Sequence, residues 1–147
     1  MMTPDDTAAP LELTGTVLCI EDQLFNMTLV EEMLSAFPGI KFLKAFNGRD
    51  GVRLAQAERP DLVLLDMRLP DIGGLEVVRA LSEQISQRKL RIVLPTGDSF
   101  SIDVVKAMSL VALEYWPKPL TLDRTLVGLR RVLGELPRRR AGRESAG

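Results

Sequence analysis

Two patterns of apolar positions follow each other in turn along this chain. Short apolar runs of strand length occur five times, at 17–20, 40–46, 62–65, 90–94 and 113–116. After each run, apolar residues recur every three or four positions, which predicts a helix. These helical repeats lie at 29–37, 52–57, 75–85, 102–110 and 122–133. The chain is therefore expected to alternate strand and helix five times.

The first, third and fourth apolar runs are largely continuous rather than alternating. Such strands are buried on both faces, as in a parallel sheet that helices cover on each side. The predicted fold class is therefore α/β with a doubly wound sheet. We expect one folded domain over 15–136, a flexible leader over 1–14 and a basic, disordered tail over 137–147. The 14 residues after Leu133 are expected to be too few for an output domain.

Composition narrows the functional classes. The net charge of -1 argues against a large nucleic-acid surface, which needs a concentrated basic patch. No apolar stretch approaches the roughly 20 residues that span a bilayer, and the polar start does not fit a signal peptide. A cytoplasmic protein is expected. The single cysteine, Cys19, excludes an intramolecular disulfide and is expected to be a core residue, and the absence of histidine excludes histidine catalysis.

Charged and hydroxyl side chains follow the predicted strands. Glu21 and Asp22 end the first strand, Asp66 the third, Thr96 the fourth and Lys118 the fifth. In doubly wound sheets, ligands bind outside the carboxyl ends of the strands. Neighbouring carboxylates repel each other and attract a hard cation such as Mg²⁺, which also bridges to phosphate oxygens. The pattern indicates phosphoryl transfer, with Asp66 as the candidate nucleophile.

Four motifs at matching spacing carry a resemblance to the receiver domains of bacterial response regulators, over about 16–133. They are EDQLFN, DLVLLDMRLPDIGG, VLPTGD and YWPKP. The spacings are 44 residues from Asp22 to Asp66, 30 from Asp66 to Thr96 and 22 from Thr96 to Lys118. The resemblance implies a flavodoxin-like fold, with a five-stranded parallel sheet of order 2-1-3-4-5 and five helices.

The resemblance also implies a phosphoacceptor and a metal shell. Asp66 would accept the phosphoryl group and bind Mg²⁺. Asp22 would bind the metal directly, and Glu21 through water. The backbone carbonyl of Arg68 would complete the protein's share of the metal ligands.

Further roles follow for residues around the phosphoryl group. Lys118 would pair with it, Thr96 would move toward it, and Tyr115 occupies the position of the family's aromatic switch. Arg68 and Asp98 each lie two residues after a site residue, and we expect them to form an ion pair that covers the phosphoryl group and slows its hydrolysis.

Two prolines depart from the family pattern. Pro95 precedes Thr96, and Pro117 precedes Lys118. Each removes a backbone donor near the site. We expect these prolines to affect switching more than phosphorylation.

The function expected is that of a single-domain response regulator, which is not an enzyme beyond its own phosphorylation and dephosphorylation. A sensor histidine kinase or a histidine phosphotransfer protein would donate to Asp66, and the output would be a protein contact or a phosphorelay step. A homodimer could form through the fourth helix, fifth strand and fifth helix. The apolar residues there, which could equally be core, are Val104, Val105, Met108 and Leu113.

Other functional classes fit the sequence less well. A receiver-fold adaptor would act without phosphate. An aspartyl-phosphate phosphatase resembling the haloacid dehalogenases would need an aspartate where Arg68 stands. A flavodoxin would need a phosphate-binding loop after the first strand, where Glu21 and Asp22 would instead repel the flavin phosphate.

Overall fold

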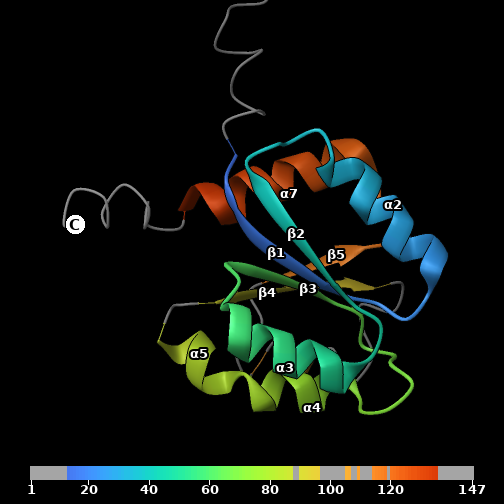
Figure 1. Ribbon diagram of the computed structural model, residues 1–147, viewed down its shortest axis with the longest axis vertical. Coiled ribbons are helices and arrows are strands. Elements are labelled where there is room, and N and C mark those ends of the chain that lie inside the picture. Colours follow the sequence, from blue (N-terminus) through green and yellow to red (C-terminus); the bar gives the residue numbers. More distant parts are fainter. Residues whose placement is uncertain are drawn as a thin grey trace, which may run out of the picture.

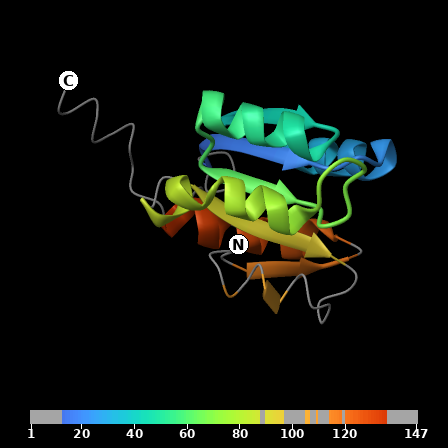
Figure 2. The same ribbon diagram turned by 90° about the horizontal axis from the view of Figure 1, so that it is seen from below.

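Five parallel strands form one sheet in a computed structural model that describes residues 13–87, 90–96, 105–106, 109, 114–118 and 120–135. The strands are β1 Gly15–Ile20, β2 Ile40–Ala45, β3 Leu62–Leu65, β4 Arg91–Thr96 and β5 Glu114–Pro117. Their order is β2-β1-β3-β4-β5. Figure 2 shows the strand arrows pointing the same way, so the carboxyl ends lie along one edge. The predicted fold class and strand order are confirmed.

Helices cover both faces of the sheet. They are α2 Leu24–Leu34, α3 Gly48–Glu58, α4 Gly74–Ala80, α5 Ser82–Ser86 and α7 Leu122–Glu135. Figure 1 shows α2 and α7 on one face, and α3, α4 and α5 on the other. Within the part of the chain that the structure describes, no helix combines the length and the apolar character needed to cross a bilayer.

Two core clusters, one on each face of the sheet, explain the continuous apolar runs. In β1, Leu18 and Ile20 join the cluster under α3 and α4, whereas Val17 and Cys19 join the cluster under α2 and α7. Side chains of a strand point alternately to opposite faces, so both sets must be apolar when both faces are covered. Cys19 is 3% exposed, which confirms that it is a core residue.

The prediction of one continuous helix over 75–85 was wrong, because the structure has two helices there, α4 and α5. The division falls at Leu81, whose backbone angles of φ -102° and ψ 8° interrupt the helix between α4 and α5. Leu81 stays fully buried, and Gln84 Nε2 in α5 donates to the carbonyl of Ala55 at 3.1 Å. The break thus keeps the apolar side chain in the core while α5 caps the last turn of α3.

The fourth predicted helix, 102–110, lies mostly outside the described residues. Val105, Lys106 and Ser109 are described and are helical. Residues 1–12 of the predicted leader and the whole predicted tail over 137–147 lie outside the described residues as well.

The two unusual prolines both lie within strands: β4 runs through Pro95, and β5 ends at Pro117. Pro95 pairs with Trp116, and Thr96 pairs with Pro117. Pairing between β3 and β4, in contrast, ends at Leu64 and Val93. The end of β4 that leads into the site is therefore held by β5 rather than by both neighbours, next to a residue that has no N–H to donate.

Candidate functional site

Three carboxylates meet where β1 and β3 end. The backbone N–H of Glu21 donates to the carbonyl of Ala45 at 3.0 Å, and that of Asp66 donates to the carbonyl of Ile20 at 3.0 Å. These bonds fix both acidic residues as extensions of their strands. Carboxylate oxygens of Glu21, Asp22 and Asp66 all lie within 4.8 Å of one another. The structure thus brings these three carboxylates together, as the sequence predicts, and their roles stay predictions.

Glu21 is the buried member of this acidic cluster, with 5% of its surface exposed. Burial and the nearby Asp66 raise the pKa of Glu21, against the opposing effects of a hydrogen bond from the Gln23 N–H and of Lys118. The Gln23 bond to Oε2 is 3.1 Å long. Burial is thus the main reason why the ionised form of Glu21 is disfavoured, and the charge of Asp66 adds to it.

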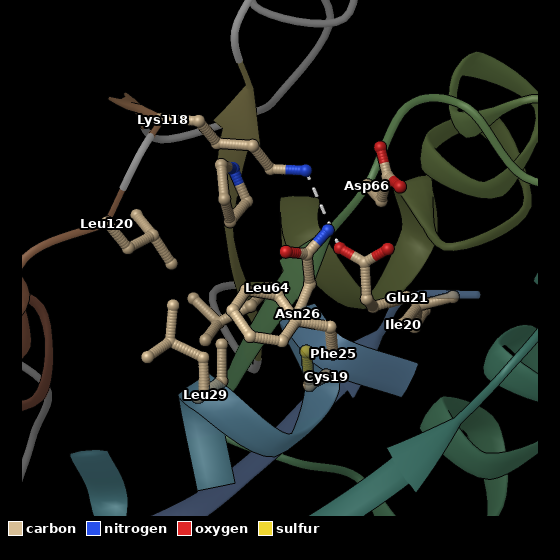
Figure 3. Close-up of a pocket in the computed structure, with 12 residues that line it drawn as sticks. Cys19, Ile20, Glu21, Phe25, Asn26, Leu29, Leu64, Asp66, Lys118 and Leu120 are labelled. Atoms are coloured by element: carbon tan, nitrogen blue, oxygen red, sulfur yellow. Dashed lines mark ion pairs between the residues drawn. The ribbon is translucent and has the colours of Figure 1, made fainter. Parts of the chain in front are cut away.

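Among the described residues, Lys118 places a positive charge next to the acidic cluster. Its Nζ lies 3.6 Å from Oε1 of Glu21, and its side chain is 29% exposed. Figure 3 shows this side chain reaching from the end of β5 toward Glu21, with Asp66 beside it. The structure thus places Lys118 beside the acidic cluster, with Glu21 as its carboxylate partner.

A cavity of about 350 Å³ opens beside the acidic cluster. Asp66, Glu21 and Lys118 line its polar end, and its other walls are mostly apolar (Figure 3). Phe25, in the first turn of α2, lines this cavity with 77% of its surface exposed. The acidic cluster can thus be approached from solvent along an apolar wall. Sequence reasoning missed this feature, because the apolar residues at the start of α2 do not by themselves show that they are exposed.

Some predicted site residues are placed only by their backbone. Thr96 ends β4, and Tyr115 pairs with Leu94 in β5. The side chains of Thr96 and Tyr115 and the whole of Asp98 lie outside the described residues. Arg68 is exposed in the loop after β3, and its N–H donates to Asp66 Oδ1 at 3.1 Å.

Sequence reasoning also missed Asp71, in the same loop. Its Oδ1 accepts from the N–H of Gly48 at 2.7 Å, and its Oδ2 from that of Arg49 at 2.9 Å. Although desolvation alone would raise it, these backbone donors lower the pKa of Asp71 to about 2. The signal lay in the sequence as an acidic residue in a turn, but its partner 23 positions earlier could not be inferred from local pattern.

The donor set fits a hard divalent cation. The oxygens of the three carboxylates lie close enough together to bind one ion. Among the described residues, the ammonium of Lys118 is paired with one of these carboxylates. Mg²⁺ prefers such oxygen ligands and leaves positions for water and phosphate oxygens. The residues that could hold it are Glu21, Asp22 and Asp66, and Asp66 also lines the open cavity.

Comparisons with known proteins agree with this geometry. The family model described as the response regulator receiver domain matches residues 17–129. The polar-differentiation response regulator DivK of Brucella anthropi is 28% identical over 120 residues, which cover 82% of this chain and 97% of that protein.

Solved structures resemble the chain over most of its length. The receiver domain of the sensor histidine kinase PA1611 from Pseudomonas aeruginosa, which holds a magnesium ion in its active site cleft, is 27% identical with a TM-score of 0.74. That match covers 83% of this chain and 99% of the other. The chemotaxis response regulator CheY4 of Vibrio cholerae is 26% identical with a TM-score of 0.71, and that match covers 82% of this chain and 99% of the other. The chain belongs to the response regulator receiver domain family, the phosphoacceptor family of two-component signalling.

Proposed function

We propose that this protein is a single-domain response regulator whose Asp66 accepts a phosphoryl group in a Mg²⁺-dependent reaction. The donor is a sensor histidine kinase or a histidine phosphotransfer protein. One observation carries the proposal. Glu21, Asp22 and Asp66 bring carboxylate oxygens within 4.8 Å of one another, and Lys118 lies beside them. Family membership supports the same chemistry.

In this reaction, an oxygen of Asp66 forms a bond to phosphorus while the phosphorus–nitrogen bond to the donor imidazole breaks. The imidazole nitrogen keeps the electron pair of that bond. Asp22, Asp66, the Arg68 carbonyl and, through water, Glu21 would hold Mg²⁺. The bound metal would neutralise charge on the phosphoryl oxygens.

Lys118 changes partner in this proposal. It is paired with Glu21 before transfer, at 3.6 Å. A phosphoryl group on Asp66 would add negative charge beside it and draw the ammonium away from Glu21. Thr96 and Tyr115 would follow as the residues that report the new charge to the surface of the domain.

Arg68 and Asp98 are proposed to cover the phosphoryl group as an ion pair. Arg68 lies two residues after Asp66, in the exposed loop that borders the site. An ion pair at this position would hinder an attacking water and lengthen the life of the acyl phosphate. The effect is expected to be modest, since exposed pairs are usually worth under about 1 kcal/mol.

The output is proposed to be a protein–protein contact or a further phosphotransfer step, in the cytoplasm. A homodimer through the predicted helix over 102–110, β5 and α7 is one form of such contact. Three apolar side chains support this face as a contact surface: Val105 is 52% exposed, Leu122 55% and Val127 57%. Val104, Met108 and Leu113, which the sequence also suggested, lie outside the described residues.

Transfer from a histidine-phosphorylated donor tests the proposal against a phosphate-independent adaptor. Wild type should gain the phosphoryl group, and Asp66→Asn should not. Phe25→Ala should slow transfer from a protein donor more than phosphorylation by acetyl phosphate, because Phe25 borders the approach to Asp66. Partner binding that is equally strong in Asp66→Asn and unaffected by phosphorylation would favour the adaptor.

A further inference from the structure

The loop over 67–73, here called the acceptor loop, carries Arg68 away from Asp66 and back to α4. Its two ends are tied together, because the N–H of Gly74 donates to the carbonyl of Met67 at 3.1 Å. A Cβ on Gly74 would lie 2.7 Å from the Met67 Cα, so only glycine allows this close approach. Between its ends the loop is largely exposed. Its position therefore depends on contacts made in the middle of the loop.

Leu69 packs against the core, and Asp71 and Ile72 reach the first turn of α3. Asp71 accepts from the N–H groups of Gly48 and Arg49 at 2.7 and 2.9 Å. A Cβ on Gly48 would lie 2.5 Å from Cγ1 of Ile72, so the helix start and the loop are in close contact. A carboxylate at a helix N-terminus is also favoured by the helix dipole.

The helix has a cap of its own besides Asp71. Asn47 Oδ1 accepts from the N–H of Asp50 at 2.7 Å. The Asp71 hydrogen bonds thus join two distant segments rather than serve only to begin a helix. They differ from the Asn47 cap in that one partner belongs to the loop that follows the phosphoacceptor.

Through α3, Asp71 links the acceptor loop to the strand that carries the other acidic residues. Gly51 of α3 packs directly on Ile20, where an added Cβ would lie 2.4 Å from the Ile20 Cδ1. Ile20 is the residue before Glu21. The start of α3 therefore touches both halves of the site: the acceptor loop on one side, and the end of β1 on the other.

We propose that Asp71 is a positioning residue for the metal site, which holds the acceptor loop at the α3 N-terminus so that the Arg68 carbonyl and Asp66 face Glu21 and Asp22. This inference rests on the proposed function, since it assigns a role in binding Mg²⁺. Residues that orient metal ligands typically change metal affinity by about 10-fold or more when they are removed.

Asp71→Ala and Asn47→Ala form a matched pair that tests this role in the intact chain. Each removes acceptors from the first turn of α3, and only the first releases the acceptor loop. Calorimetric titration with MgCl₂ should show affinity reduced about 10-fold in Asp71→Ala and changed less than about 2-fold in Asn47→Ala. Asp71→Asn keeps one acceptor oxygen and should give an intermediate loss. Thermal unfolding of each metal-free variant checks that all are folded.

Amide hydrogen exchange without metal gives a second readout. The Gly48 and Arg49 amides and the acceptor loop should exchange faster in Asp71→Ala, whereas Asn47→Ala should leave the loop unchanged. Equal losses of Mg²⁺ affinity in Asp71→Ala and Asn47→Ala, or no loss in either, would overturn the proposal. A wild type that binds no Mg²⁺ would instead overturn the proposed function, and this inference with it.

Discussion

Lys118 Nζ lies 3.6 Å from Oε1 of Glu21, so the cation at the end of β5 is paired with the most buried carboxylate of the acidic cluster. This pairing joins the ends of β1 and β5 across β3 and β4, and Asp66 follows β3 between them. It also offsets part of the repulsion among the three carboxylates. Lys118 therefore opposes the same negative charge that a bound Mg²⁺ would neutralise.

Removal of Lys118 should weaken the metal-free fold and strengthen metal binding. In Lys118→Met, Glu21 keeps its buried charge without a partner, which should lower the free energy of unfolding by about 1 kcal/mol. Mg²⁺ should bind about 3-fold more tightly, because a competing positive charge is gone. Urea unfolding and calorimetry measure the two effects. Lys41→Met, which breaks an exposed pair with Glu58, is the control and should alter neither. Weaker Mg²⁺ binding in Lys118→Met would contradict this account.

Asp66→Asn should stabilise the metal-free protein. It removes one of three carboxylates that lie within 4.8 Å of each other, and the repulsion relieved should raise the free energy of unfolding by about 1–3 kcal/mol. Mg²⁺ should raise the melting temperature of wild type and have little effect on the variant. Thermal unfolding with and without MgCl₂ measures both. A less stable variant would mean that the cluster is not under electrostatic strain.

The alternation of strands and helices and the acidic cluster could be predicted because they depend on local pattern, whereas the strand order followed only from the resemblance to receiver domains. Apolar runs ending in Glu21, Asp66 and Lys118 place these residues at one edge of any parallel sheet. The break at Leu81 could not be predicted, because the apolar repeat of the sequence continues through it. The same holds for Asp71, whose partners Gly48 and Arg49 are brought to it by the fold.

Gly128 in α7 is expected to be intolerant of any side chain. An added Cβ would lie 2.3 Å from Cζ2 of Trp116, the buried residue two positions before Lys118. Gly128→Ala should therefore lower the free energy of unfolding by about 1–3 kcal/mol. Gly134→Ala, in the same helix with nothing within 4 Å of the added Cβ, is the control. It should be neutral or stabilising by up to about 1 kcal/mol. Urea unfolding followed by the fluorescence of Trp116, the single tryptophan, gives both values. Equal effects of the two changes would refute the packing argument.

Arg68→Ala should shorten the life of the phosphorylated protein. Loss of the proposed cover over the phosphoryl group admits water to the acyl phosphate, and hydrolysis should speed up about 2- to 5-fold, the equivalent of under about 1 kcal/mol. The decay of phosphorylated protein after removal of the donor measures this rate. Arg53→Ala, on the exposed surface of α3, is the control. An unchanged rate in Arg68→Ala would rule out the cover.

The central claim is that Asp66 accepts a phosphoryl group with the help of Mg²⁺. Intact-protein mass after incubation with acetyl phosphate, with and without MgCl₂, tests it most directly on wild type and Asp66→Asn. The account predicts a gain of one phosphoryl group in wild type with Mg²⁺, and none without Mg²⁺ or in Asp66→Asn. A gain that persists in Asp66→Asn, or a wild type that gains none with Mg²⁺ from acetyl phosphate and from kinase donors alike, would contradict it.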